Sequence, residues 1–348
     1  MRILIIKINQ LGDNLVYLPV LQALLDRFGA DTIDLFTSPT ASGLFEGLLP
    51  PSRIHVHDRD EFNRAWKNPV RMAAIIREVR KVRPDLVLVP YDQGNVARIA
   101  ARLSGARHRI GVANPGLRTN WCLNRCLNPD LASPMAEQDW MVMREVSRVL
   151  GDDENGFPDT PPAPDLEHLL PADGRKSPRR ALIHGGASRE YKRWPLARFV
   201  ELGNRLADAG FEVAWCSQEE DAEKELSPRI DILPQGSLRD FIVATARCGV
   251  FVGNNSGPMN IANALGLPCV IFSGPSPEKW DPFWHREQNL NLRDAELPCQ
   301  PCDPVTGPVG SCQNTAEPMA CMNRWSVDSV FAKVKAMLEG KPGSGPNS

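Results

Sequence analysis

The chain has 348 residues, a formal net charge of −2 and nine cysteines, and 42% of its residues are hydrophobic. This length favours two domains over a single core, and the composition is typical of a soluble globular protein. No apolar run approaches the eighteen residues that would indicate a membrane span. The N-terminus has one arginine, a short β-rich stretch and no small-residue cleavage site, so we expect a cytoplasmic protein without a signal peptide.

Charge is distributed unevenly along the chain. Residues 1–150 contain 20 Lys and Arg against 15 Asp and Glu, a net charge of +5; the totals of 40 and 42 leave 20 and 27 for the remainder, a net charge of −7. The basic half suits an anionic acceptor or a membrane surface, and an ordinary solvated surface explains it equally well. The excess is too small to indicate nucleic acid binding.

Strand and helix patterns alternate from the N-terminus. The predicted strands are at 2–8, 32–38, 85–91 and 108–113, and the predicted helices are at 15–28, 68–83 and 94–105. This alternation favours a parallel, doubly wound sheet.

The alternation restarts after residues 151–179, a stretch rich in Pro, Asp and Gly that is typical of a linker. Strands are predicted at 180–186, 211–217, 250–254 and 268–274, and helices at 195–210, 237–249, 257–266 and 325–339. The predicted fold class is therefore α/β, with two Rossmann-like domains facing each other across a cleft and ligands at the carboxyl ends of the strands. The predicted bounds are 1–155 for the first domain, 156–179 for the linker, 180–325 for the second domain, 326–340 for a C-terminal helix and 341–348 for a disordered tail.

Asp13 comes soon after the first predicted strand, where the chain is expected to turn on Gly12 and begin a helix. This places the carboxylate at the carboxyl edge of the sheet. Two interpretations stay open: a helix cap or first-turn acid, which the helix dipole favours, and a general base.

Small residues open the second domain after its first strand. They are Gly185, Gly186, Ala187 and Ser188, and Lys192 and Arg193 follow them. Backbone N–H groups in such a stretch can approach a diphosphate, although Lys192 by itself could equally be a solvating surface lysine. The pattern is neither G-x-G-x-x-G nor a P-loop, which counts against a nicotinamide oxidoreductase and a P-loop kinase.

Two further turns follow strands of the second domain. Residues 253–257 form a polar turn before a helix, which fits either donor groups at a helix N-terminus or routine turn chemistry. Glu219 and Glu220 lie in an acidic run after the strand at 211–217. An acid there suits a ribose hydroxyl, and a solvated helix start is the alternative.

Four of the nine cysteines share a loop rich in Pro and Gly at 299–321. They are Cys299, Cys302, Cys312 and Cys321, in the spacing C-x2-C-x9-C-x8-C. In a cytosolic chain this spacing favours a tetrathiolate site for zinc or iron, with free thiols and redox disulfides as alternatives. Four protein ligands would make the site structural.

Three stretches in this order resemble glycosyltransferase family 9, the ADP-heptose heptosyltransferases of lipopolysaccharide synthesis, over about residues 1–335. They are "MRILIIKINQLGDNLVYLPVLQAL", "HGGASREYKRWPLARFVEL" and "FVGNNSGPMNIANALGLPCVIFSGPSPEKWDP". The resemblance implies the GT-B fold, with the acceptor in the first domain and the nucleotide sugar in the second.

The resemblance also implies roles for individual residues. Asp13 falls on the general base that deprotonates the acceptor, Lys192 on a phosphate contact, and Glu220, with Glu219 as the alternative, on a ribose contact. The implied chemistry is an inverting displacement with ADP leaving, and no catalytic metal is expected. The implied donor-binding set is Gly12, Gly186, Ser188, Arg193, Glu220, Asn255, Ser256, Gly257, Pro258 and Asn260.

The sequence departs from the family in the third stretch. The family carries Asp-Ser-Gly or Asp-Thr-Gly and then His three residues further, whereas this chain has Asn255 and Asn260 at the Asp and His positions. The departure puts the identity of the donor in question more than the reaction class. Some protein-modifying relatives hold iron with a cysteine finger near the C-terminus, which supports a metal at the four cysteines.

The leading hypothesis is an inverting glycosyltransferase that moves a heptose, or a related sugar, from an ADP-sugar to a lipopolysaccharide-core glycolipid at the inner membrane. We expect a cytoplasmic location, with peripheral contact at the inner face of the cytoplasmic membrane as an option. The alternatives are a protein-modifying heptosyltransferase of the same family, a non-catalytic GT-B nucleotide-sugar-binding protein and, with less motif support, a sugar-nucleotide epimerase.

Overall fold

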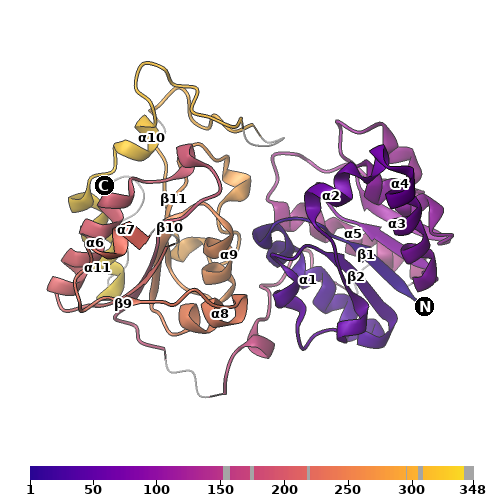
Figure 1. Ribbon diagram of the computed structural model, residues 1–348, viewed down its shortest axis with the longest axis horizontal. Coiled ribbons are helices and arrows are strands. Elements are labelled where there is room, and N and C mark those ends of the chain that lie inside the picture. The colour runs from indigo at the N-terminus through magenta and orange to yellow at the C-terminus, as the bar shows by residue number, and fades with distance from the viewer. Residues whose placement is uncertain (152–156, 173–175, 218–219, 295, 305–308, 341–348) are drawn as a thin grey trace. The chain divides into compact units, whose positions relative to one another are not determined.

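The computed structural model describes residues 1–151, 157–172, 176–217, 220–294, 296–304 and 309–340 (Figure 1). The chain forms two units, Met1–His168 and Leu169–Ser348. The boundary between them falls inside the stretch for which the sequence predicts a linker. The predicted disordered tail at 341–348 lies outside the described residues.

The first unit is built on a parallel six-stranded sheet in the order β3-β2-β1-β4-β5-β6. Its strands are β1 (Ile3–Ile6), β2 (Ile33–Thr37), β3 (Ile54–Val56), β4 (Leu86–Val89), β5 (His108–Val112) and β6 (Arg125–Leu127). Its helices are α1 (Leu11–Phe28), α2 (Arg59–Arg64), α3 (Pro69–Val82), α4 (Asn95–Leu103) and α5 (Met135–Leu150). Helix α1 packs on α5, and α3 packs on α4. Leu4 and Ile6 share a core cluster with Ile75 of α3 and Ala97 of α4, and all four residues of β1 are buried because helices cover both faces.

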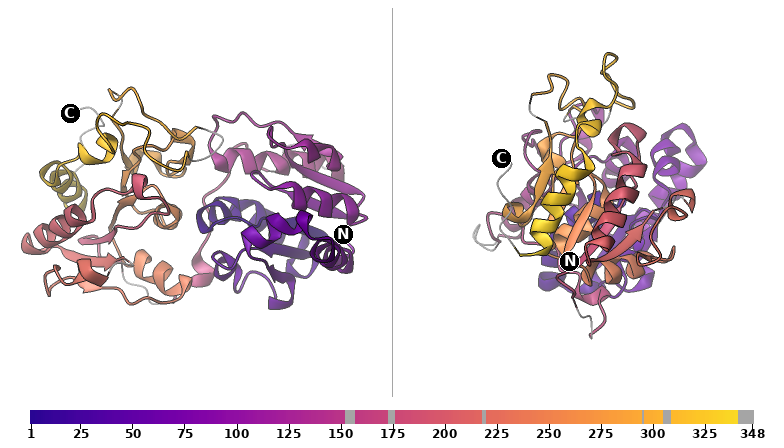
Figure 2. Two further views of the ribbon diagram at one scale, coloured as in Figure 1. Left: turned by 45° about the horizontal axis from the view of Figure 1, so that its top comes forward. Right: turned by 90° about the vertical axis from the view of Figure 1, so that its left-hand side faces the viewer.

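The second unit repeats this plan with the order β12-β11-β10-β7-β8-β9. Its strands are β7 (Arg180–His184), β8 (Glu212–Cys216), β9 (Asp231–Ile232), β10 (Val250–Asn254), β11 (Cys269–Phe272) and β12 (Leu290–Leu292). Its helices are α6 (Leu196–Asp208), α7 (Glu220–Glu223), α8 (Leu238–Ala246), α9 (Gly257–Ala264), α10 (Ala320–Asn323) and α11 (Val327–Leu338). Figures 1 and 2 both show α6 and α11 side by side. Val252 packs into their cluster and its neighbour Phe251 into the cluster of α9, since successive strand residues point to opposite faces.

Both sheets have the same strand order, which confirms the predicted α/β class with two Rossmann-like units. In each unit the first strand lies between the second and the fourth, so the order reverses beside it. The two reversal points are between β1 and β4 and between β7 and β10. Ligands of such sheets bind outside the carboxyl ends of the strands at the reversal point.

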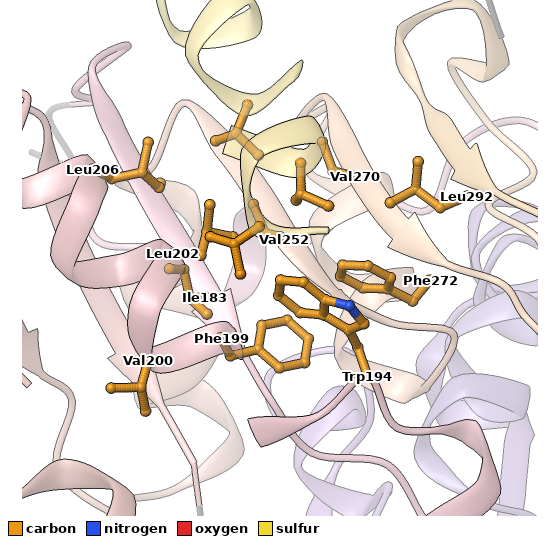
Figure 3. Packing of buried hydrophobic residues seen from close by; sticks show 14 of the residues in the cluster. Ile183, Trp194, Phe199, Val200, Leu202, Leu206, Val252, Val270, Phe272 and Leu292 are labelled. Carbon is orange, nitrogen blue, oxygen red and sulfur yellow. The ribbon is translucent and has the colours of Figure 1, made fainter. Parts of the chain in front are cut away.

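A cluster of aromatic rings fixes the chain between β7 and α6 (Figure 3). Trp194 is fully buried and stacks on Phe272 with ring centroids 4.4 Å apart, while Phe199 meets the Trp194 ring edge-on at 4.8 Å. The indole Nε1 donates a hydrogen bond of 3.0 Å to the carbonyl oxygen of Trp325. The side chain of Lys192, two residues earlier, therefore extends from a backbone segment that the contacts of Trp194 hold in place.

The structure differs from the sequence prediction at the first helix. Helix α1 begins at Leu11, four residues before the predicted start, and Gly12 is its second residue. Gly12 is not among the glycines with positive φ, so the prediction that the chain turns on Gly12 is wrong. Helix α5, the short helices α2 and α10, and the edge strands of both sheets (β3, β6, β9 and β12) were not predicted. Among the helices of the described residues, none combines the length and apolar character that crossing a membrane requires.

His55, on β3, is held between two carboxylates. Its Nε2 lies 2.9 Å from Asp34 Oδ1, and its Nδ1 lies 3.2 Å from Glu78 Oε1. Burial by itself lowers the pKa of His55, but the hydrogen bonds to Asp34 and Glu78 outweigh burial and raise this pKa to about 9. The hydrogen bond from His55, and then the His57 imidazole 3.5 Å from Glu78 Oε2, lower the pKa of Glu78 to about 2. The imidazolium thus ties β2, β3 and α3 together while it is charged.

The His55 cluster predicts a pH dependence of stability. Because folding raises the pKa of His55, this residue contributes fully to the free energy of unfolding below about pH 6.5, and the contribution is lost as the pH rises through about 9. Because folding lowers the pKa of Glu78, its contribution is complete above about pH 4.5 and is lost as the pH falls through about 2. We expect the midpoint denaturant concentration of unfolding to decrease as the pH is raised from 6.5 to 9. In His55→Gln this decrease should be smaller. His285→Asn, at an exposed His, is the control. An equal fall in the His55 variant would contradict this assignment.

Candidate active site

Two loops meet at the reversal point of the first sheet. They are Lys7–Gln10 after β1 and Tyr91–Gly94 after β4. The Ile8 N–H donates to Gln93 Oε1 at 3.1 Å, and Gln93 Nε2 donates in turn to Asn9 Oδ1. Asn9 Nδ2 donates to Asp92 Oδ2 at 3.2 Å. These amide contacts fix the carboxyl ends of the two strands against each other.

A buried ion pair lies beneath these loops. Lys7 Nζ is 2.8 Å from Asp139 Oδ2, and both side chains are 0% exposed. Asp139 Oδ1 accepts the N–H of Tyr91 at 2.9 Å, so the pair joins β1, α5 and the loop after β4. Burial raises the pKa of Asp139 despite the opposing effect of Lys7. Loss of either partner would leave an uncompensated buried charge, which typically costs about 3–5 kcal/mol.

Asp13 is the third residue of α1 and is half-buried. The helix cap is Gln10, so the interpretation of Asp13 as the cap is wrong, while its first-turn position is as expected. Its charge adds to burial in raising the pKa of both Asp92 and Asp139, which shows that the three carboxylates are neighbours. Among the residues that the structure describes, none donates a hydrogen bond or forms an ion pair with Asp13. Asp92 and Asp139 have such partners.

Asn254 organises the reversal point of the second sheet. This fully buried amide donates from Nδ2 to the carbonyl of Gly185 at 2.9 Å and accepts the N–H of Trp194 at Oδ1, also at 2.9 Å. A Cβ on Gly185 would lie 2.9 Å from Leu196 Cδ1, and one on Gly186 would lie 2.9 Å from His184 Cε1. The small residues after β7 are therefore required by close packing. Burial lowers the pKa of His184 to about 4, so this imidazole is neutral at pH 7.

Lys192 is not a freely solvated lysine. Its Nζ lies 2.6 Å from Asp303 Oδ2 and 3.4 Å from Ser276 Oγ, and its side chain is 12% exposed. The ammonium also lies 4.7 Å from the centroid of the Trp280 ring. Next to it, Arg193 donates from Nε to the carbonyl of Ala187 at 2.9 Å. Ser188 is exposed in the same loop.

The polar turn after β10 makes its described side-chain contacts with residues of the second unit. Ser256 precedes α9, which begins with Gly257 and Pro258, and Asn260 is half-buried on that helix. Asn255 Nδ2 donates to Asp281 Oδ1 at 3.1 Å. Burial raises the pKa of Asp281, which accepts two hydrogen bonds from Arg293, at 2.9 and 3.0 Å. The amide at position 255 is thus paired with a carboxylate that is only 11% exposed.

The predicted ribose contact stays untested. Glu219 lies outside the described residues, and for Glu220 the structure gives only a backbone position at the start of α7, after β8.

The four loop cysteines are free thiols, of which Cys321 is buried and the other three are half-buried. Cys312 Sγ accepts the N–H of Met319 at 3.3 Å, and Asn314 donates to Cys299 Sγ at 3.8 Å. Burial, and then the proximity of the other three thiols, raises the pKa of Cys321 to about 12. Within the described ranges, no three His, Cys, Asp or Glu side chains form a group that could hold a metal ion.

Sequence reasoning missed the residues that support the predicted ones. They are Lys7, Asp92, Asp139, Asn254, Asp281 and Asp303. Lys7 lies within the first stretch that resembles the family, Asn254 and Asp281 lie within the third, and Asp303 directly follows Cys302, so these four belong to segments that the sequence had already singled out. Nothing local in the sequence indicates their partners.

Comparison with known proteins places these two sites in a family context. Residues 72–308, more than half of the chain, match the model of glycosyltransferase family 9 (heptosyltransferase). Lipopolysaccharide heptosyltransferase 2 of Escherichia coli (strain K12) is 30% identical over 113 residues, which cover 29% of this chain and 32% of that protein. The matched segment thus spans about a third of the length of that relative.

Two solved structures share the fold. The E. coli heptosyltransferase WaaC with ADP has a TM-score of 0.68 at 17% identity, over 97% of this chain and 100% of WaaC. The iron-containing dodecameric glycosyltransferase TibC from enterotoxigenic E. coli has a TM-score of 0.53 at 14% identity, over 97% of this chain and 77% of TibC. The likeness to WaaC confirms the predicted GT-B class. With two Rossmann-like sheets and a family match over residues 72–308, the chain belongs to glycosyltransferase family 9 (heptosyltransferase).

Proposed function

We propose that this chain is an inverting glycosyltransferase that transfers a heptose, or a related sugar, from an ADP-sugar to a lipopolysaccharide-core glycolipid. The observation that carries the proposal is Asp13, a half-buried carboxylate at the reversal point of the first sheet to which no described residue donates a hydrogen bond. The names of the relatives support the class of substrate: one is a lipopolysaccharide heptosyltransferase, and WaaC was solved with ADP. A glycolipid acceptor implies contact with the inner face of the cytoplasmic membrane, and the net charge of +5 in residues 1–150 suits such a surface.

The first unit supplies the base in this mechanism. Asp92 and Asp139 are occupied by Asn9 and Lys7, so Asp13 is the carboxylate of the three that is available to a substrate hydroxyl. Asp13 takes the proton of the acceptor hydroxyl while the hydroxyl oxygen bonds to the anomeric carbon. The bond from that carbon to the diphosphate oxygen breaks, and its electron pair leaves with ADP, so the configuration inverts.

The second unit meets the charge that develops on the leaving diphosphate. Lys192 supplies an ammonium, and the loop after β7 supplies backbone N–H groups around Gly186 and Ser188. Preorganised donors of this kind stabilise a transition state more than a flexible surface group does.

Asp13→Asn tests the base. We expect kcat to fall by roughly two to four orders of magnitude, because general-base catalysis is lost, while ADP affinity stays near normal. The measurement is transfer from ADP-heptose to lipid A–core acceptors followed by mass spectrometry, with Asp31→Asn, an exposed acid of the same unit, as the control. An unchanged rate would remove Asp13 from the mechanism. Transfer only from another nucleotide sugar would reject heptose and leave the reaction class standing.

Asn255→Asp restores the family residue, and we expect it to harm the protein. A carboxylate at 255 would face the largely buried Asp281 at the 3.1 Å distance that the amide now bridges, and two such groups repel. Loss of the hydrogen bond and the added repulsion should cost about 1–3 kcal/mol of unfolding free energy. The exchanged pair Asn255→Asp with Asp281→Asn should recover part of that loss. Denaturant unfolding measures both, and a stability of the single variant equal to the parent would contradict the pairing.

We further propose a structural zinc or iron at Cys299, Cys302, Cys312 and Cys321. Four thiols are the donor type that zinc and iron accept, but the described side chains are not grouped closely enough to hold a metal ion, so metal binding would require the thiols to move together. The likeness to TibC, an iron-containing glycosyltransferase, supports iron as one candidate. A bound metal would hold the loop in one conformation, and no step of the transfer involves it.

Elemental analysis of the purified protein tests the metal. We expect about one equivalent of zinc or iron, strongly reduced in Cys302→Ser and unchanged in Cys269→Ser, a fully buried cysteine of β11. Less than about a tenth of an equivalent in the parent protein would count against the site.

A further inference from the structure

Asp303 is a fully buried carboxylate in the cysteine-rich loop, one residue after Cys302. Its Oδ1 accepts hydrogen bonds from the Tyr191 hydroxyl at 2.8 Å and from the Val309 N–H at 3.0 Å. Its Oδ2 lies 2.6 Å from Lys192 Nζ. Each oxygen thus has a partner, as a carboxylate removed from water requires.

The backbone around Asp303 is fixed as well. Its own N–H donates to the carbonyl of Pro275 at 3.0 Å, in the turn after β11 that also carries Ser276. Ser276 Oγ is the second polar group near Lys192 Nζ, at 3.4 Å. Asp303 therefore joins three segments distant in sequence: the loop after β7, the turn after β11 and the cysteine-rich loop.

Lys192 retains one open direction in this arrangement. An ammonium has three N–H donors. In the described contacts its polar neighbours are Asp303 Oδ2, in an ion pair at 2.6 Å, and Ser276 Oγ, while the Trp280 ring beside it offers no oxygen or nitrogen acceptor. The 12% of the side chain that stays exposed is the part that a ligand can reach. A lysine has a long flexible stem, and a fixed counter-ion removes most of that freedom before the ligand arrives.

We propose that Asp303 is the positioning residue of Lys192, which aims the third ammonium donor at the diphosphate of the nucleotide sugar and couples the cysteine-rich loop to the donor site. The inference rests on the proposed function, because it needs Lys192 to contact the donor. Asp303 itself does not touch the donor. It acts through Lys192. The cysteine-rich loop, which carries Asp303 but no catalytic group, is therefore necessary for rapid transfer.

The test compares two substitutions at the same carboxylate anchor. Asp303→Asn keeps the size of the side chain and an oxygen for Tyr191 and Val309 but removes the charge that holds Lys192. Tyr191→Phe removes one hydrogen bond to Asp303 and leaves the ion pair, so it serves as the matched structural control. We measure kcat and KM for the ADP-sugar, ADP affinity by calorimetry and the unfolding midpoint for each variant.

We expect Asp303→Asn to lower kcat/KM for the donor by roughly ten- to a hundredfold and to lower ADP affinity severalfold. Its unfolding midpoint should be close to that of Tyr191→Phe. Tyr191→Phe should stay within about threefold of the parent in kcat/KM. Because both residues act through one group, Asp303→Asn combined with Lys192→Ala should be no slower than Lys192→Ala alone. Asp303→Glu, which keeps the charge, should regain part of the loss and covers the case in which Asp303→Asn does not fold.

Four results would overturn the inference. One is a loss of stability in Asp303→Asn with donor kinetics like those of Tyr191→Phe, which would make Asp303 a structural anchor of the loop. Another is full additivity of the Asp303→Asn and Lys192→Ala effects. The third is unchanged ADP binding and transfer in Lys192→Ala, which would reject the donor role of Lys192 in the proposed function itself. If Lys192→Ala is impaired and Asp303→Asn is not, the positioning role alone fails.

Discussion

A charged side chain that is buried away from water needs an opposite charge beside it. Each unit of this chain has such a Lys–Asp ion pair next to the reversal point of its sheet. In the first unit Lys7 and Asp139 are 2.8 Å apart, and in the second Lys192 and Asp303 are 2.6 Å apart. Each pair joins a loop that follows the first strand of its sheet to a segment more than a hundred residues later in the chain. The loops that surround the two candidate sites depend on these contacts for their positions.

The two pairs differ in their access to solvent, and that difference separates their roles. Both partners of the first pair are 0% exposed, so Lys7 cannot reach a ligand and the pair holds the structure together. In the second pair only the aspartate is fully buried, and the lysine keeps an exposed fraction. A buried ion pair seldom adds net stability compared with apolar packing. Under the proposed function, the pair of the second unit holds the Lys192 ammonium in place for the diphosphate of the donor.

Periodicity and turn residues predicted most of the fold, because the central strands are continuous apolar runs flanked by helical patterns, as in β1 and α1. Helix α5 was not predicted because polar residues interrupt its apolar stripe. The buried polar residues of this helix are Gln138, Asp139, Glu145 and Ser147. The edge strands β3 and β12 have three residues each, too few to show a period. Motif order singled out Asp13 and Lys192 as candidates, but it indicated neither Asp139 nor Asp303, since an ion pair between residues so distant in sequence leaves no local pattern.

Asn255 shows how a departure from a family pattern acquires a physical meaning once its partner is known. Taken alone, Asn in place of Asp removes a charge from the donor segment. In the structure that amide donates to Asp281, a largely buried carboxylate that also accepts two hydrogen bonds from Arg293. The segment therefore keeps a carboxylate, displaced from the turn before α9 to the chain after β11, and a second acid at 255 would only repel it. If the donor sugar contacts this segment, as the family resemblance implies, it meets an amide backed by a carboxylate and a guanidinium, and the donor specificity of this chain should then depend on that trio.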